Sequence, residues 1–298
     1  MRWKGRRGSS NIDDRRGRSG RRRVRATGGR RMRAGGGLGI TGILVVVGIA
    51  WLMGVNPLTL LSQLDGGGSF ETQSYQGQAP SRPADGETAQ FVSVVLADTE
   101  DTWGRIFEGH GGHYPEPTLV LFSGSVSSAC GYASAATGPF YCSADDKLYI
   151  DLSFYERLAN QLNAPGDFAQ AYVLAHEVGH HIQNVLGVLP EFHKVRKTLS
   201  KAEGNALSVR VELQADCYAG IWAHFAAKQR GFVEEGDIEE ALNAASRIGD
   251  DTLQRQAQGY VVPESFNHGT SAQRARWFRE GFQSGQLEAC DTFSARKL

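Results

Sequence analysis

The chain has 298 residues, enough for one large domain or two small ones, and either could bury a proper core. Its formal net charge is zero, but residues 1–37 contain thirteen Arg and one Lys against two Asp, whereas the remainder holds 18 basic and 30 acidic residues. This split excludes a single uniform role for the whole chain: the two parts lie in different surroundings or do different jobs.

The apolar segment 38–55 follows the basic run and predicts a transmembrane helix. It carries no charge and only Thr41 as a polar side chain, and a helix of this length would reach ~27 Å, close to the hydrocarbon thickness of a bilayer. A cleaved signal peptide is the alternative, but its basic region would be unusually long and no A-x-A-like cleavage site follows. The basic flank favours a retained single-pass helix in an inner membrane, with the N-terminus in the cytoplasm and the rest in a periplasm or outside the cell.

The basic run 1–37 is predicted to be a disordered cytoplasmic tail. It has few aromatic residues and matches no nucleic-acid-binding fold, so a topology signal that also contacts anionic lipid is favoured and no nucleic-acid partner is expected. Residues 56–88 are rich in Gly, Ser, Gln, Pro and Asp and predict a flexible linker. The folded domain is expected over residues 89–298.

Four cysteines lie in the part predicted to be outside the cytoplasm, and an even number there fits disulfides. Cys130 and Cys142 enclose a loop rich in Gly, Ser and Ala, which favours a local pair. Cys217 with Cys290 would then tie the C-terminal tail to the core. Four buried free thiols are the alternative; a Cys-ligated metal is disfavoured because no CxxC spacing occurs.

Hydrophobic periodicity predicts a domain that is mainly helical with a small sheet near its start, an α+β fold. Apolar residues recur at helical spacing from Phe91 to about His110. The segments 118–122 and 147–152 suit strands. Beyond them the pattern predicts helices at about 153–163, 167–187, 190–202, 205–229, 236–257 and 270–284.

The predicted helix 167–187 contains an HExxH motif, formed by His176, Glu177 and His180. On a helix, positions i and i+4 share a face, so both imidazoles can bind one zinc ion. Glu177 lies beside that face, where its carboxylate can take a proton from a zinc-bound water. The alternative is a core helix with two hydrogen-bonded histidines, but these buried polar groups would be costly without partners.

A zinc site needs a third protein ligand, and a later helix supplies one. The metzincin extension would require Gly and His where Gln183 and Leu186 stand, so that class is excluded. Glu212 and Asp216 form an ExxxD pattern on one face of an otherwise apolar helix. Glu212 can complete a His₂Glu site, while Asp216 can accept a hydrogen bond from a ligating histidine and orient its ring. A solvated helix face is the alternative for this pair, and the weaker rivals for the third ligand are Glu191, His193 and Glu203.

The chain resembles the bacterial neutral zinc metallopeptidase family. Its motifs stand here as Tyr172–Gln183 (YVLAHEVGHHIQ) and Glu212–Gly220 (ELQADCYAG). The resemblance spans nearly the whole chain and includes Asp13–Gly17, Gly138–Cys142 and Cys290–Phe293. It implies a zincin-like fold of the gluzincin type, with one zinc ion held by the two motif histidines and the glutamate of the second motif, and with the motif glutamate as general base.

A group that stabilises charge on the carbonyl oxygen is also needed. His268 precedes a helix that bears Arg274 and Arg276, and prenyl-protease-like gluzincins place a similar His-then-Arg segment after their zinc helices. By this analogy His268 or Arg274 is the candidate, with Tyr172 and Tyr141 as others; a helix cap or a surface charge is the plainer interpretation of each. His181 is expected to be structural.

These observations predict a zinc-dependent metalloendopeptidase acting on a peptide or protein substrate, with residues 147–152 as the edge strand that pairs with it. The alternative from another class is a zincin-scaffold chaperone or adaptor for envelope proteins, with structural zinc. A hydrolase for peptidoglycan cross-links or another amide stays open, since the same chemistry serves any amide.

Overall fold

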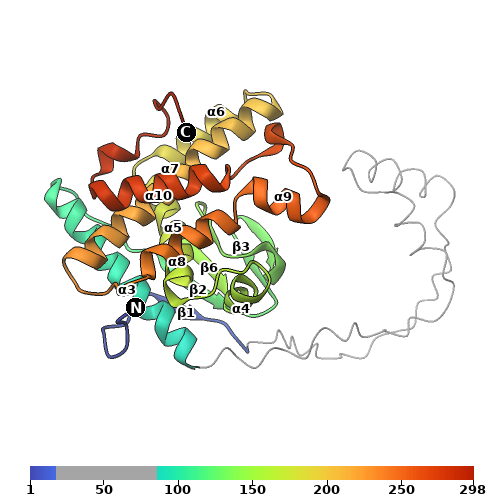
Figure 1. Cartoon of the computed structure of the whole chain (residues 1–298). Helices are drawn as coiled ribbons and strands as arrows, with labels where there is room; N and C mark the ends of the chain where they lie inside the picture. The colour runs from blue at the N-terminus through green and yellow to red at the C-terminus, as the bar shows by residue number, and fades with distance from the viewer. Residues whose placement is uncertain (18–85) are drawn as a thin grey trace, which may run out of the picture. The chain divides into compact units, whose positions relative to one another are not determined.

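In this computed structural model, which describes residues 1–17 and 86–298, a four-stranded sheet packs against a set of helices (Figure 1). The strands stand in the order β1 (Ile12–Asp14), β2 (Thr118–Phe122), β6 (Lys147–Asp151) and β5 (Phe140–Cys142). The first three are parallel, and β5 runs antiparallel to β6. A separate antiparallel hairpin is formed by β3 (Ser125–Ser128) and β4 (Gly131–Ser134).

The alternation of side chains along β2 and β6 divides the interior into two cores. Leu119 and Leu121 on β2, like Leu148 and Ile150 on β6, face the large helical core. The intervening side chains join a smaller core that is covered by the β3–β4 hairpin; they are Val120, Phe122 and Tyr149. Because successive side chains of a strand point to opposite faces, two short apolar runs can serve both cores.

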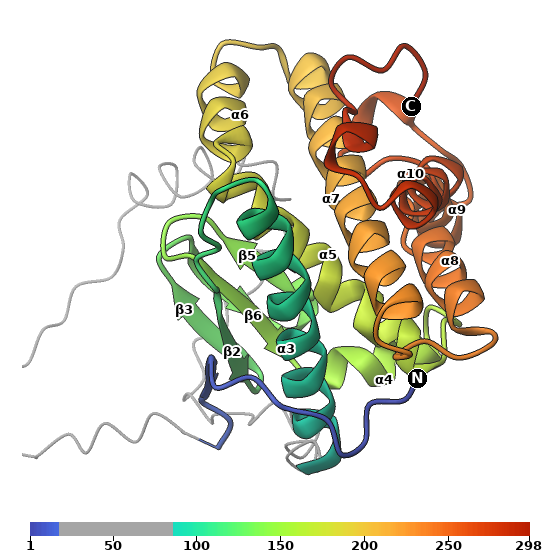
Figure 2. The ribbon, with the colours of Figure 1, turned by 90° about the vertical axis from the view of Figure 1, so that its left-hand side faces the viewer.

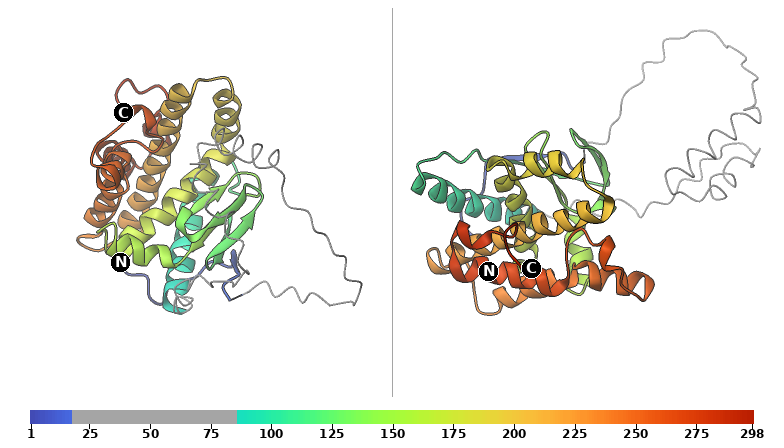
Figure 3. Two further views of the ribbon diagram at one scale, coloured as in Figure 1. Left: turned by 90° about the vertical axis from the view of Figure 1, so that its right-hand side faces the viewer. Right: turned by 90° about the horizontal axis from the view of Figure 1, so that it is seen from above.

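The helices fill the rest of the described chain. They are α3 (Gly86–Gly109), α4 (Ser153–Asn160), α5 (Asp167–Val185), α6 (Val188–Arg196), α7 (Lys201–Lys228), α8 (Asp237–Arg247), α9 (Asp250–Gln258) and α10 (Ser271–Ser284), with short 3₁₀ turns η1 (Ala135–Thr137), η2 (Pro263–Ser265) and η3 (Leu287–Cys290). Helix α5 lies between the sheet and the C-terminal helices α7, α8 and α10 (Figure 3). The mainly helical α+β fold predicted from the sequence is thus confirmed.

One predicted helix, 236–257, is two helices with a break at Gly249. The backbone of Ser271 lies so close that a Cβ at Gly249 would collide with it. The amide of Asp250 donates to the carbonyl of Gly269 (2.9 Å) instead of continuing the first helix. The break is therefore set by a segment distant in sequence, and the local periodicity gave no sign of it.

The prediction that residues 147–152 form the edge strand is wrong, because β6 lies between β2 and β5. The outer strands are β1 and β5, and the sequence analysis missed both of them, as it missed the β3–β4 hairpin. With only three residues, β5 is too short for a periodic pattern. It folds back on β6 through the turn 143–146, so that Phe140 stands opposite Tyr149.

The prediction of disorder for residues 1–37 is wrong for residues 1–17, which pack along α3 as an N-terminal strap (blue in Figure 2). Trp3 is 8% exposed and meets the Phe91 ring edge-on, with centroids 5.4 Å apart. The amide of Ser9 donates to the carbonyl of Ser93 (2.9 Å), and the strap ends in β1. An aromatic anchor and backbone pairing outweigh the conformational freedom that the basic composition suggested.

In the described part of the chain no helix is both long and apolar enough to cross a membrane. The predicted membrane helix 38–55 lies outside the described residues, as do residues 18–37 and almost all of the predicted linker 56–88.

Replacement of Trp3 tests the docking of the strap. We expect Trp3→Ala to lower the free energy of unfolding by about 2–4 kcal/mol, the range for loss of a large buried side chain. The control is Lys4→Ala, whose side chain is 75% exposed, pairs with Glu87 and lies 5.5 Å from the centre of the Trp3 ring. Contacts of so exposed a side chain contribute little, so this variant should change stability by less than about 1 kcal/mol. Urea unfolding of both variants measures the difference, and equal stabilities would show that Trp3 is not anchored.

Candidate metal centre

The two motif helices, α5 and α7, approach closely in the core. An added Cβ at Gly179 would lie 2.9 Å from the carbonyl oxygen of Ala215 and 3.0 Å from its Cα. Glycine is therefore needed inside the HExxH motif, where the two backbones nearly touch. This contact places the face of α5 that carries His176 and His180 opposite the face of α7 that carries Glu212.

The side chains of His176, His180 and Glu212 meet at this crossing. Nε2 of His176 lies 3.2 Å from Glu212 Oε2, and Nε2 of His180 lies 3.6 Å from Glu212 Oε1. One ligand atom from each of the three residues lies within 4.8 Å of the others. Two imidazole nitrogens and a carboxylate form a donor set that suits zinc, with room for a fourth ligand.

The ring of His176 is held from behind by Asp216. Oδ1 of Asp216 lies 2.8 Å from His176 Nδ1, which leaves Nε2 to face Glu212. Asp216 in turn accepts hydrogen bonds from the hydroxyl of Tyr172 and from Arg274, whose Nε and Nη2 lie 2.8 and 2.9 Å from its two oxygens. All four side chains are buried, so the orientation of His176 is determined by a fully paired network.

The ring of His180 is held by Gln183, a residue to which the sequence analysis gave no role. Nδ1 of His180 lies 2.8 Å from Gln183 Oε1. The amide nitrogen of Gln183 donates to the carbonyl of Val211 (2.8 Å) and to Gln214 Oε1 (3.0 Å), both on α7. The spacing offered a signal, since Gln183 lies one turn after His180, but nothing local shows that its amide is anchored on α7.

The oppositely charged groups of the site stabilise each other's ionised forms. Burial raises the pKa of Asp216, but Arg274 and His176 outweigh it and lower the pKa to about 2. Burial lowers the pKa of His176, whereas Asp216 and Glu212 raise it to about 10. The pKa of Glu212 lies well below its usual range because the two histidines outweigh its burial. Both carboxylates are therefore ionised, and Glu212 is the one that can bind a cation.

The rivals for the third ligand lie elsewhere. Glu191 pairs with Lys194 at the surface, and Glu203 caps the start of α7 through Ser200. His193 lies on α6 and lines the cavity described next, without joining the group of ligand atoms in the described chain.

A cavity of about 600 Å³ opens over the three candidate ligands. Glu177 lines it and is buried, and its carboxylate makes no hydrogen bond with any described residue. One wall contains β5 and the preceding turn, and several apolar side chains complete the lining: Phe154, Leu162, Val173, Leu189, Phe192, Val211, Ile248 and Leu253. A cavity of this size, mostly apolar with a few polar groups, suits a segment of peptide.

His268 also lines the cavity, at its exposed side. Its Nδ1 lies 3.1 Å from Asp250 Oδ1, while Oδ2 of Asp250 accepts the amides of Asn267 (2.8 Å), His268 (2.7 Å) and Gly269 (3.1 Å). Asp250 thus shapes the loop and holds the ring with Nε2 available. Its role was missed because its partners are about eighteen residues away.

The other candidates for stabilising the carbonyl oxygen have different partners. Tyr172 and Arg274 bind Asp216, as described above. The hydroxyl of Tyr141 donates to Asp146 (2.8 Å) and lies 3.1 Å from His181 Nδ1. His181 also contacts the carbonyl of Pro115 through Nε2 (2.6 Å), in keeping with the structural role expected for it.

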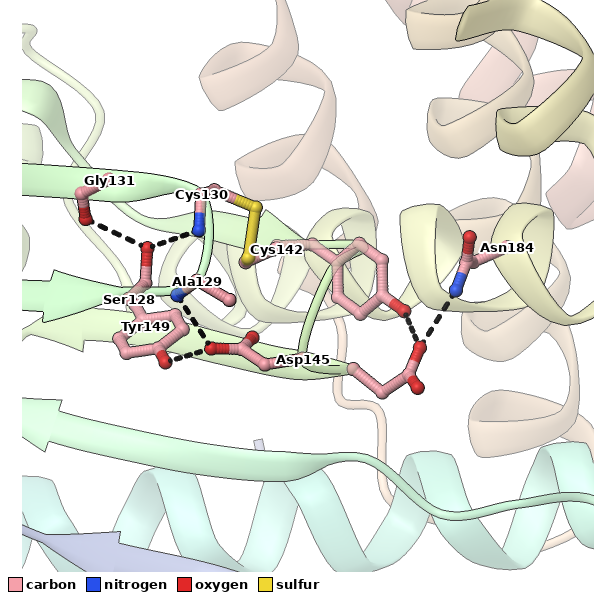
Figure 4. Close-up of a disulfide and its surroundings, with 10 residues drawn as sticks. Ser128, Ala129, Cys130, Gly131, Cys142, Asp145, Tyr149 and Asn184 are labelled. Carbon is pink, nitrogen blue, oxygen red and sulfur yellow. Dashed lines mark hydrogen bonds between the residues drawn. A yellow bond between two sulfur atoms is a disulfide. The ribbon is translucent and has the colours of Figure 1, made fainter.

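Both predicted disulfides are present, Cys130–Cys142 and Cys217–Cys290. The first ties the tip of the β3–β4 hairpin to β5 at the cavity wall (Figure 4). Beside it, Asp145 accepts hydrogen bonds from the hydroxyl of Tyr149 (2.7 Å) and the amide of Ala129 (3.1 Å). The second joins α7, directly after Asp216, to η3.

Comparisons with known proteins agree with this site. The family model described as "Putative neutral zinc metallopeptidase" matches residues 1–293. An uncharacterized protein of Escherichia coli strain K12, YpfJ, is 49% identical over 293 residues, which cover 98% of this chain and 99% of the relative. The uncharacterized protein Rv2575 of Mycobacterium tuberculosis is 42% identical over 263 residues, covering 84% of this chain and 86% of the relative. No solved structure matches.

The raised pKa of His176 makes metal binding depend on pH. Below about pH 10 the metal-free His176 carries a proton that a metal must displace, because only the neutral ring offers a lone pair. We expect zinc binding at pH 7 to release at least one proton and the affinity to rise at least about tenfold per pH unit between pH 6 and 8. Calorimetry in buffers of different ionisation enthalpy measures the release. Asp216→Asn should reduce it, and zinc binding without proton release would contradict the assignment.

Proposed function

Since the chain belongs to the neutral zinc metallopeptidase family, we propose that it is a zinc-dependent endopeptidase. The observation that carries this proposal is the buried Glu177 carboxylate, without a hydrogen-bond partner in the described chain, in the same cavity as a His₂Glu donor set. A structural zinc site is usually closed by four protein ligands, whereas a catalytic site has three and an open position.

His176, His180 and Glu212 would hold one zinc ion through their Nε2 and Oε atoms. A zinc ion bound there lowers the pKa of water and polarises a carbonyl group. The protein contributes the orientation: Asp216 and Gln183 fix the two rings, and the α5–α7 contact fixes the distance between ligands.

Glu177 acts as the general base and then as the general acid. Its carboxylate accepts a proton from the attacking water and donates it to the nitrogen of the leaving amine. Apolar side chains line much of the cavity around it, and a bound substrate segment would displace water from them.

His268 is proposed to stabilise the negative charge that develops on the carbonyl oxygen. Asp250 holds the ring at Nδ1. An imidazolium ring donates from both nitrogens, so Nδ1 can donate to Asp250 while Nε2 donates to the carbonyl oxygen. Asp250 is then a positioning residue, because it acts on the substrate only through His268.

The substrate is proposed to be an extended segment of peptide or protein that adds to β5. This is one of the two outer strands of the sheet, and Phe140 and Tyr141 on it line the cavity. The backbone of an outer strand can pair with a peptide, while the apolar side chains of the opposite wall accept a large hydrophobic residue. An edge strand beside two zinc-binding helices is the arrangement of a zincin-like fold, which is part of this proposal.

The catalytic domain is proposed to lie on the extracytoplasmic side of a bacterial membrane. The two disulfides support this location, since such bonds persist in oxidising compartments.

Two glutamate variants separate catalysis from metal binding. We expect Glu177→Gln to retain zinc and lose activity by a factor of about 10² to 10⁴, because it can no longer take up the proton. Glu212→Gln should instead lose zinc, with affinity reduced by more than the roughly 10–100-fold typical of outer-sphere partners. Glu191→Gln, at an exposed site on α6, is the matched control with unchanged zinc content and activity.

Zinc content and cleavage of an unfolded protein, with and without chelator, measure these effects. An active Glu177→Gln variant would overturn the mechanism. A wild-type protein that binds zinc and unfolded chains but cleaves none would favour the chaperone or adaptor instead.

Two histidine variants test whether His268 stabilises the charge on the carbonyl oxygen. We expect His268→Ala to retain zinc and lower kcat about 10² to 10³-fold, as loss of an oxyanion donor does, with a smaller effect on KM. Asp250→Asn should have a lesser effect of the same kind. His193→Ala, which also lies in the cavity wall, is the control and should leave kcat within a few-fold of wild type. Equal kcat values for the two alanine variants would remove His268 from the mechanism.

A further inference from the structure

We infer that the N-terminal strap, residues 1–17, lies on the same side of the membrane as residues 86–298 and is a part of the catalytic domain. The sequence alone predicted the opposite, a cytoplasmic tail separated from the domain by a single crossing of residues 38–55. This inference concerns sidedness and does not depend on the proposed peptidase activity.

The first observation is apolar and cationic packing near the start of the strap. Trp3 is buried against Phe91 of α3. The guanidinium of Arg6 lies 4.7 Å from the centre of the Phe232 ring and donates to the carbonyl of Arg230 (2.9 Å). Residues 230 and 232 follow α7, so the strap binds both the first helix of the domain and the segment after α7.

The second observation is a buried carboxylate that the strap satisfies. Glu100 on α3 is 3% exposed. It accepts hydrogen bonds from the hydroxyl of Ser9 (2.5 Å) and the amide nitrogen of Asn11 (2.9 Å), and Arg7 lies 3.6 Å away. Without the strap this carboxylate would lose all three partners. A buried carboxylate is costly without partners, so the domain is built to be completed by these residues.

The third observation is that the strap completes the sheet. The amide of Leu119 donates to the carbonyl of Asn11 (2.8 Å), and the amide of Arg15 donates to the carbonyl of Leu121 (2.8 Å). Between them, β1 pairs with β2 in parallel, with Ile12 opposite Leu119. Without the strap, this edge of β2 would present unpaired backbone groups next to the core.

These contacts are incompatible with a membrane between strap and domain. They join atoms about 3 Å apart, whereas the hydrocarbon layer of a bilayer is ~30 Å thick. The preference of Arg for the cytoplasmic side is a statistical bias, while the packing requires one compartment. The inference is therefore one compartment for the strap and the domain, in place of the opposite sides that the sequence alone predicted. If the disulfides place the domain outside the cytoplasm, the strap lies there as well.

Thiol labelling of the full chain in intact cells tests this sidedness. All four native cysteines are in disulfides, so a single introduced cysteine is the one thiol that a maleimide can label. Ser10→Cys marks an exposed position of the strap and Lys201→Cys an exposed position of the domain. We expect a membrane-impermeant maleimide to label both before lysis, or both only after lysis. Labelling of one before lysis and the other only after it would overturn the inference.

A second measurement tests the docking without reference to a membrane. Asn11→Ala removes a partner of the buried Glu100 and should lower the melting temperature by about 2–8 °C. Ser10→Ala, at the adjacent exposed position, is the control and should leave it unchanged within about 1 °C. Identical melting temperatures for the two variants would show that the strap does not complete the domain.

Discussion

The close crossing of α5 and α7 is the constraint on which the rest of this structure depends. The candidate ligands come from both helices, so their separation is the separation of two backbones. Gly179 permits that distance because the carbonyl of Ala215 occupies the space where a side chain would begin. The same crossing lets Gln183 of α5 reach the carbonyl of Val211, so one contact determines both the ligand positions and the orientation of His180.

The C-terminal third of the chain serves to hold α7 in this position. Helix α10 also packs without intervening side chains, since an added Cβ at Gly281 would collide with the carbonyl of Cys217. From α10, Arg274 neutralises Asp216, and from η3 Cys290 forms a disulfide with Cys217. A charge pair and a covalent bond thus act on adjacent residues of α7, next to the group that orients His176.

The cavity wall opposite these helices is built differently. There a short outer strand is held by the β3–β4 hairpin, the Cys130–Cys142 disulfide and the turn that links β5 to β6. Asp146 in that turn accepts a hydrogen bond from Asn184 of α5 (2.7 Å), so the strand and the zinc-motif helix are coupled directly. A peptide bound along β5 would therefore lie in a fixed relation to His180.

The sequence by itself determined what is local: the motif histidines and Glu177 on one helix, Glu212 and Asp216 on another, the bounds of β2, and the family. These follow from residue type and from spacing of three or four positions. Only the tertiary structure decided the order of the strands, the role of Gln183, the Asp250 cradle under His268 and the docking of Trp3. Each of these depends on groups brought together from distant parts of the chain, and no periodicity records which distant segment a side chain will meet.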